Sequence, residues 1–252
     1  MRTPWPAEFP DVVVHTTVAE RDAHLGYADA KAGDPDAAFE LAFDLLNDAA
    51  VDHLRDTLAN DVLLLPVVAD ETLGFNAIPD AMAQILARDL GLPAVENGEI
   101  IQTNKVGHTR AKAFQRLVTP AFFEGHVVPG ADYFLVDDHV GLGGTLANLR
   151  GYIELNGGRV VGMTALSESR DGSLISLRPA TRIMLWDKHG AALDQLWQTQ
   201  FGYGIDCLTE VEAQVLCRQP SVDAIQDFLA QAAVEARGRG LEAAVGEENE
   251  GA

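Results

Sequence analysis

The sequence predicts an α/β fold, in which helices flank a mainly parallel sheet, with a helical N-terminal segment and a C-terminal helical extension. Three observations predict it. Short apolar runs alternate with amphipathic helical segments over residues 61–166, which is the pattern of parallel β-α-β units. The 252 residues are 47% hydrophobic, enough for a complete core. The two cysteines cannot form a disulfide framework, so that core must hold the fold together.

We expect one domain over residues 1–237, with its core at about 61–166. A helical segment over 1–60 precedes the core, and a helical extension over 167–237 follows it. The last residues, 238–252, hold four glutamates and four glycines with few apolar side chains. They are predicted to form an acidic, disordered tail.

The N-terminal segment begins with three prolines within ten residues, so residues 1–33 are predicted to be irregular. Asp34 and Pro35 then predict a helix start, because proline suits the first helical turn. Apolar residues at helical spacing continue this helix to Leu46. The apolar run over 61–65, which ends at a proline, predicts a buried strand.

The same patterns predict the later elements. In the core, we expect a helix over 76–90, strands over 99–103 and 133–136, a helix over 146–153 and a strand over 159–166. In the extension, we expect helices over 179–190, 191–201, 209–218 and 221–237. Thr209 and Ser221 are suitable N-caps, and Glu212 is placed for a capping box with Thr209.

The net charge of −20 restricts the partners of the chain. Eighteen basic against 38 acidic side chains repel phosphate backbones and anionic lipid, so no duplex nucleic acid and no membrane surface is expected as a partner. No apolar run reaches the ~18 residues of a membrane span. With no secretion signal at the N-terminus and only two cysteines, we expect a cytoplasmic protein.

The segment Tyr133–Gly158 carries the most specific chemistry. A buried strand brings Asp137 and Asp138 to the carboxyl end of the sheet, where α/β proteins bind ligands. A glycine-rich turn and a helix start follow, and their N–H groups favour an anion. Carboxylates favour hydroxyls or a metal ion, so a sugar phosphate would satisfy both ends of the segment.

Two other glycine motifs do not fit. A dinucleotide fingerprint needs glycine or alanine at its sixth position, where this loop has Leu146. A P-loop needs a Gly-Lys pair, which the chain lacks. A strand that merely ends in acids before a tight turn is the structural alternative.

A basic stretch, residues 104–114, stands out in so acidic a chain. It holds three of the 18 basic residues, so it is either a solvated loop or a contact for an anionic ligand.

The segment Tyr133–Gly158 resembles the motif with which type I phosphoribosyltransferases bind phosphoribosyl pyrophosphate (PRPP): four apolar residues, two acids and a loop ending in Gly-Gly-Thr-Leu. The resemblance implies that Asp137 and Asp138 bind the ribose hydroxyls. It implies a 5′-phosphate loop made of Val140, Gly141, Leu142, Gly143, Gly144 and Thr145. Gly141 and Leu142 stand where the family often has hydroxyl residues, so backbone donors remain there. His139 is either a supporting partner or exposed, and we expect it to be exposed.

Positions elsewhere follow from the same resemblance, which covers about residues 61–166. The pyrophosphate loop would be Val67, Val68 and Ala69. The basic stretch corresponds to the flexible catalytic loop, in which Lys105 and Arg110 would neutralise the departing pyrophosphate. His108, Thr109 and Lys112 would also close over the ligand. Mg²⁺ would be the cofactor, held by the ligand with no direct protein ligand, and any contact from the aspartates would run through water.

The resemblance implies an enzyme that transfers a 5-phosphoribosyl group from PRPP to a nitrogenous, base-like acceptor and releases pyrophosphate. The stretches 27–33 and 207–213 are similar to a bacterial subgroup of unassigned phosphoribosyltransferase-like proteins. Two alternatives stay open: a catalytically weak PRPP or nucleotide sensor, and an interaction module of a multi-protein bacterial system. The family also implies a homodimer.

Overall fold

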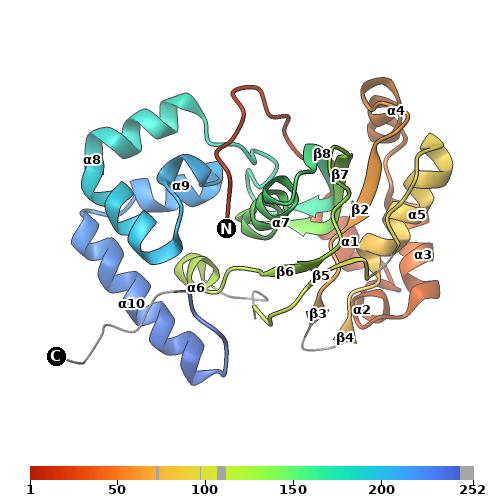
Figure 1. Ribbon diagram of the computed structural model, residues 1–252. Helices are drawn as coiled ribbons and strands as arrows, with labels where there is room; N and C mark the ends of the chain where they lie inside the picture. Colours follow the sequence, from red (N-terminus) through yellow and green to blue (C-terminus); the bar gives the residue numbers. More distant parts are fainter. Residues whose placement is uncertain (72–73, 97, 107–111, 245–252) are drawn as a thin grey trace.

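The computed structural model (Figure 1) describes residues 1–252 except 72–73, 97, 107–111 and 245–252. Its centre is a four-stranded sheet in the order β1-β8-β7-β2, and every neighbouring pair runs parallel. The strands are β1 (Val13–Thr16), β2 (Leu63–Pro66), β7 (Asp132–Val140) and β8 (Arg159–Glu168). This sheet confirms the predicted α/β class.

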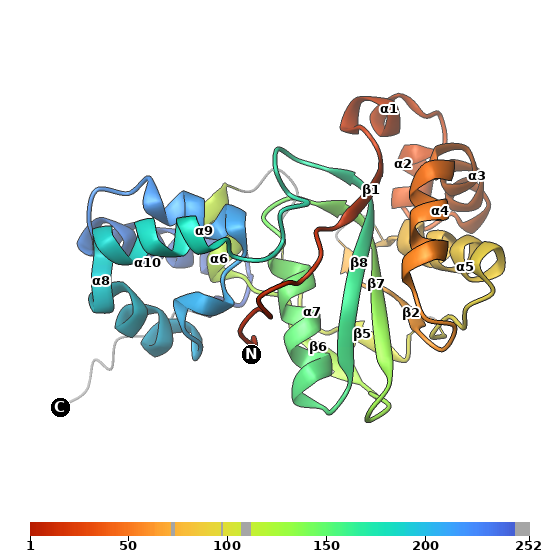
Figure 2. The same cartoon turned by 90° about the horizontal axis from the view of Figure 1, so that it is seen from above.

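Helices cover both faces of the sheet, as Figure 2 shows. They are α7 (Gly144–Leu155) on one face and α3 (Pro35–Leu45), α4 (Asp48–Thr57) and α5 (Ile78–Leu90) on the other. Side chains of β7 alternate between the two layers: Leu135 joins the cluster that includes α7, whereas Phe134 and Val136 join the cluster of α3 and α5. A strand buried on both faces explains the unbroken apolar run in the sequence.

The prediction of an irregular stretch over residues 1–33 was wrong. It contains β1 as well as α1 (Val18–Ala23) and α2 (Tyr27–Lys31). Strand β1 is only four residues long and is stabilised by pairing with β8, a contact that local sequence does not encode. Helix α1 does have a local signal, a capping box between Thr17 and Glu20.

The predicted strand over 99–103 forms, but outside the parallel sheet. Strand β5 (Ile100–Gln102) pairs antiparallel with β6 (Phe123–Gly125). Helix α6 (Ala113–Val118) lies between them in the chain. A second small sheet joins β3 (Asp70–Glu71) and β4 (Gly74–Phe75).

The C-terminal helices have a hydrophobic cluster of their own, which includes Trp197, Leu216 and Leu229. They are α8 (Pro179–Phe201), α9 (Glu210–Cys217) and α10 (Val222–Gly238), with a 3-10 turn η1 (Ile205–Cys207) between α8 and α9. Helix α8 bends at Gly190, where φ is 58°, so its two halves match the two predicted helices. The capping box of Thr209 and Glu212 is confirmed. In the described part of the chain, no helix combines the length and apolarity needed to cross a membrane.

Candidate functional site

Two consecutive aspartates lie near the carboxyl end of the sheet. Asp137 and Asp138 were expected to end their strand, but β7 continues to Val140 because its pairing with β8 extends past both acids. The acids are buried, with only 7% and 5% of their surface exposed. Carboxylates are rarely buried this deeply without a partner, so their surroundings decide what the pair can do.

A cation beside one of the two carboxylates makes the members of the pair unequal. Lys31 of α2 places its Nζ 2.8 Å from Oδ2 of Asp138. Burial acts to raise the pKa of Asp138, but the charge and hydrogen bond of Lys31, with smaller contributions from His139 and Asp137, together lower it. Burial, together with the charge of Asp138, raises the pKa of Asp137 well above its usual value. The pair therefore holds one charged carboxylate and one carboxyl that takes a proton readily, suited to a neighbouring diol.

His139 is half-buried and bonded, so the expectation that it is exposed was wrong. Its Nδ1 lies 3.0 Å from Nη1 of Arg21 and 3.0 Å from Oγ of Ser167. Its Nε2 lies 2.8 Å from Oγ of Ser169. Because a guanidinium only donates, Nδ1 accepts and the ring proton is on Nε2. Burial and the nearby Arg21 charge both lower the pKa of His139, which keeps the ring neutral.

The glycine-rich loop leads into the N-terminus of α7. Gly143 is the N-cap and has φ of 79°, a left-handed conformation that costs glycine little. The N–H groups of the first turn, beginning at Gly144, have no acceptor within the helix. No described side chain caps them, and the turn contains no acid. The loop therefore presents backbone donors in the arrangement that binds phosphate.

Arg116 of α6 lies against this loop, and the sequence did not single it out. A Cβ atom added to Gly141 would come 2.5 Å from Nη1 of Arg116, so a side chain at this position would push the guanidinium away from the loop. Burial lowers the pKa of Arg116. Its charge also contributes to the lowered pKa of His139. The residue lies just beyond the basic stretch 104–114, whose charge was the only available signal.

Helix α9 and the N-terminal segment support the loop from behind. The hydroxyl of Thr209 donates to the carbonyl oxygen of Leu142. Glu212 and Arg2 form a buried ion pair with an N–O distance of 2.5 Å. Both of these side chains come within about 3 Å of the position that a Cβ of Gly144 would take. The C-terminal extension thus fixes the loop that precedes α7.

The other expected site residues are placed less favourably or not described. The Val67 N–H donates to the carbonyl oxygen of Val136, and the Gln102 N–H donates to the carbonyl oxygen of Val68. These backbone groups of the expected pyrophosphate loop are therefore already hydrogen-bonded within the protein. Val67 and Val68 are buried and Ala69 is half-buried. Lys105 and Lys112 are exposed. His108, Thr109 and Arg110 lie outside the described residues.

The donor set is compatible with Mg²⁺ that arrives with a ligand. Over the described part of the chain, no three His, Cys, Asp or Glu side chains gather closely enough to hold a metal ion. Asp137 and Asp138 supply oxygen donors of the kind Mg²⁺ prefers, but Lys31 occupies one of them.

Comparison with curated proteins finds two longer relatives. The chain is 41% identical to Protein TraN of Escherichia coli over 239 residues, covering 94% of this chain and 53% of TraN. It is 38% identical over 155 residues to an uncharacterized protein of Haemophilus influenzae, covering 61% of this chain and 34% of that protein. The chain thus spans about half or less of the length of these relatives. No protein-family model matches it.

Comparison with solved structures finds phosphoribosyltransferases at low identity. An adenine phosphoribosyltransferase gives a TM-score of 0.33 at 15% identity, covering 54% of this chain and 72% of that one. The purine phosphoribosyltransferase of Pyrococcus horikoshii gives a TM-score of 0.32 at 16% identity, covering 54% of this chain and 83% of that one. The UMP synthase of Leishmania donovani gives a TM-score of 0.32 at 16% identity, covering 78% of this chain and 34% of that one. Similarity at this level supports neither an activity nor a ligand.

Proposed function

We propose that this chain binds PRPP at the carboxyl edge of its sheet and transfers the 5-phosphoribosyl group to a nitrogenous acceptor. One observation carries the proposal: a buried carboxylate pair and an uncapped, glycine-rich helix N-terminus lie at the two ends of one short segment. The pair suits a diol and the loop suits a phosphate, and a phosphorylated ribose carries both groups.

The charges around this edge support an anionic ligand. Arg21 contacts His139, Lys31 contacts Asp138, and Arg116 lies beside Gly141. These are three of only 18 basic residues in a chain with a net charge of −20. Lys31 pairs with Asp138 and Arg21 pairs with Asp22, so these cations offset the acids at the sheet edge. They thereby reduce the local repulsion of phosphate groups by an acidic chain.

The transfer would proceed by substitution at C1′ of the ribose. The bond from C1′ to the pyrophosphate oxygen breaks and its electron pair leaves with pyrophosphate. A lone pair of the acceptor nitrogen forms the new bond to C1′, and the acceptor releases its proton to solvent. The aspartate pair would orient the diol and stabilise the positive charge that develops at C1′. Lys105, Arg110 and Lys112 would neutralise the leaving group. Mg²⁺ would add further neutralisation of the pyrophosphate charge.

The sensor alternative rests on a specific observation. Lys31 already holds Asp138, and the Val67 N–H is already used by β7, so a ligand must displace or share these contacts. Strong binding with little turnover would follow if the ion pair stays closed. The acceptor, the homodimer and the cytoplasmic location are part of the same proposal, and each needs its own test.

Titration calorimetry on the double variant Asp137→Asn/Asp138→Asn tests the proposal. Wild type should bind PRPP with Mg²⁺ and ribose 5-phosphate, but not ribose. The variant should lose at least about tenfold in PRPP affinity, about 1.4 kcal/mol, because charge-assisted bonds to the diol become neutral. It should still fold, since Asn is isosteric with Asp. A destabilised variant with intact PRPP affinity would refute the ribose role.

A pyrophosphate-release assay separates transfer from sensing. The assay is run with PRPP, Mg²⁺ and a panel of purine, pyrimidine and nicotinate-like bases. Release that depends on one base supports the enzyme. PRPP binding without release for every base would support the sensor.

A further inference from the structure

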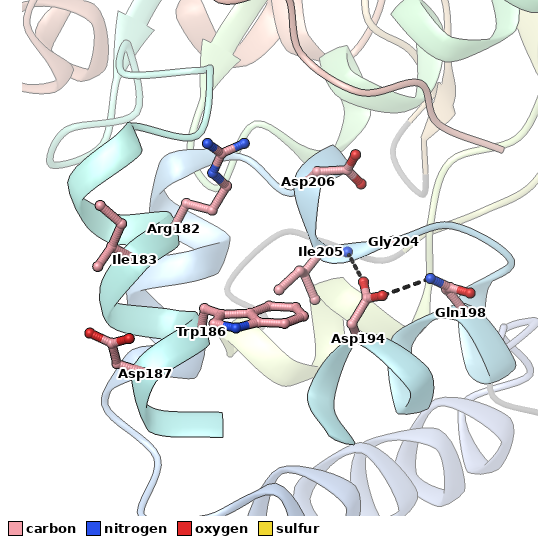
Figure 3. Close-up of a pocket in the computed structure, with 9 residues that line it drawn as sticks. All are labelled: Arg182, Ile183, Trp186, Asp187, Asp194, Gln198, Gly204, Ile205 and Asp206. Carbon is pink, nitrogen blue, oxygen red and sulfur yellow. Dashed lines mark hydrogen bonds between the residues drawn. The ribbon is translucent and has the colours of Figure 1, made fainter. Parts of the chain in front are cut away.

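A pocket of about 510 Å³ opens in the C-terminal helices, built from residues other than those of the candidate site. It lies between the two halves of α8 and the segment that leads into η1 (Figure 3). Its lining is partly apolar, from Ile183, Trp186 and Ile205, and partly acidic. Such a mixture of an apolar body and a few polar groups is typical of specific binding sites.

Two carboxylates of the pocket lining, Asp194 and Asp206, lie close to Gly204. Asp194 accepts hydrogen bonds from the Ile205 N–H at 2.9 Å and from Gln198 at 2.7 Å. A Cβ atom added to Gly204 would lie 2.8 Å from Oδ1 of Asp206 and 3.1 Å from Oδ1 of Asp194. The backbone of Gly204 is ordinary extended chain, so its missing side chain matters for space rather than conformation. Glycine at this position lets one oxygen of each carboxylate lie close to the backbone of residue 204.

The charge balance of the pocket is negative. Asp187, Asp194 and Asp206 contribute three carboxylates, and Arg182 is the one basic residue among the nine described lining residues. A bound group should therefore be cationic. Trp186 adds a second preference for a cation, because its indole lines the pocket and points from α8 toward Ile205 and Asp194 in Figure 3.

The rim of the pocket favours a protein over a small cation. Ile183, Met184 and Trp186 lie within four residues of one another on the first half of α8, and each exposes half or more of its surface. Exposed apolar residues grouped beside a pocket mark a protein contact, whereas a small cation would leave this rim uncovered.

We propose that this pocket binds an arginine or lysine side chain of a partner protein. The aliphatic stem packs on Ile205 and Trp186, and the charged head reaches Asp194 and Asp206. Apolar residues on either side of the basic residue cover Ile183 and Met184. A basic, apolar-flanked segment is complementary in charge to a chain with a net charge of −20.

The test uses a blocked tripeptide, Ac-Leu-Arg-Leu-NH₂, with Ac-Leu-Glu-Leu-NH₂ and spermidine as comparisons. Affinity is measured by calorimetry, and fluorescence locates the site, because Trp186 is half-exposed whereas Trp197 is fully buried. We expect the arginine peptide to bind with a dissociation constant below about 1 mM and to change the tryptophan fluorescence. The Trp186→Phe variant should not show this change in fluorescence.

Three variants separate the pocket from general electrostatics. Asp206→Asn should weaken the arginine peptide at least about tenfold. Gly204→Ala should weaken it without any change in charge, because the new Cβ displaces the carboxylates. Asp227→Asn, on the exposed face of α10, removes the same charge elsewhere and should have no effect.

The opposite results would overturn the proposal. They are no binding at about 1 mM, equal binding of the glutamate peptide, or equal effects of Asp206→Asn and Asp227→Asn. Spermidine binding as tightly as the arginine peptide would make the pocket a small-cation site instead. None of these outcomes depends on PRPP, so the pocket and the proposed function stand or fall separately.

Discussion

Protonation of His15 should destabilise the fold. His15 lies in β1, is buried, and uses both ring nitrogens. Its Nδ1 accepts the N–H of Asn47 at 3.2 Å, and its Nε2 lies 2.9 Å from Oγ1 of Thr164. The Thr164 hydroxyl donates to the Val13 carbonyl, so it accepts from the ring. A second ring proton, on Nδ1, would point at the Asn47 N–H and break the contact that joins β1 to the start of α4.

Burial lowers the pKa of His15 from 6.5 to about 4. Between these two values the unfolded chain binds more protons than the folded one, so stability is complete above the unfolded pKa and falls as the pH drops. The full difference corresponds to about 3 kcal/mol, at about 1.4 kcal/mol per pKa unit. Lowering the pH from about 7 to about 5 should remove about 2 kcal/mol of it.

Urea unfolding followed by circular dichroism at several pH values measures this loss. Other groups also titrate, notably Asp137, whose raised pKa acts in the opposite direction. The comparison is therefore between wild type and His15→Gln, with His53→Gln as an exposed control on α4. The stability gap between wild type and His15→Gln should narrow by about 2 kcal/mol at the lower pH. Parallel losses in both proteins would refute the assignment.

Three other changes give independent tests. Lys31→Met should lower the free energy of unfolding in urea by about 3 kcal/mol, because it leaves Asp138 buried without its cation. Lys31→Arg should restore most of this stability. An unchanged unfolding midpoint in Lys31→Met would argue against the ion pair. Arg116→Gln should weaken ribose 5-phosphate about tenfold in calorimetry at an unchanged melting temperature, while Arg218→Gln should do nothing; equal effects would remove Arg116 from the site. Light scattering should give a dimer, and a clean monomer at tens of micromolar would contradict it.

Local patterns in the sequence were enough to predict the central elements of the fold. The helix start at Asp34, the capping box of Thr209 and Glu212, and the break at Gly190 all depend on neighbours within a few residues. Strand β1 could not be predicted in this way, because its stability comes from β8, about 150 residues later in the chain. Strand β5 was predicted as a strand of the core, because its sequence does not encode that its pairing partner is β6.

The candidate site was predicted only where its residues are consecutive. Asp137, Asp138 and the loop through Thr145 form one segment, so their proximity follows from the chain itself. Lys31, Arg21 and Arg116 reach the same edge from three different helices. Their positions depend on how those helices pack, and a lysine or arginine on a short helix has no distinguishing pattern in the sequence.

The ion pair between Arg2 and Glu212 has a consequence for the order of events during synthesis. These side chains lie against Gly144 at the start of α7, and they are separated by 210 positions in the sequence. A ribosome would release Arg2, the acid pair and α7 long before Glu212 emerges. The loop would therefore lack this support until α9 had been made. Nascent chains that stop before α9 would contain the whole segment that resembles the PRPP-binding motif. They should still bind phosphate poorly, because long-range contacts such as this ion pair form late.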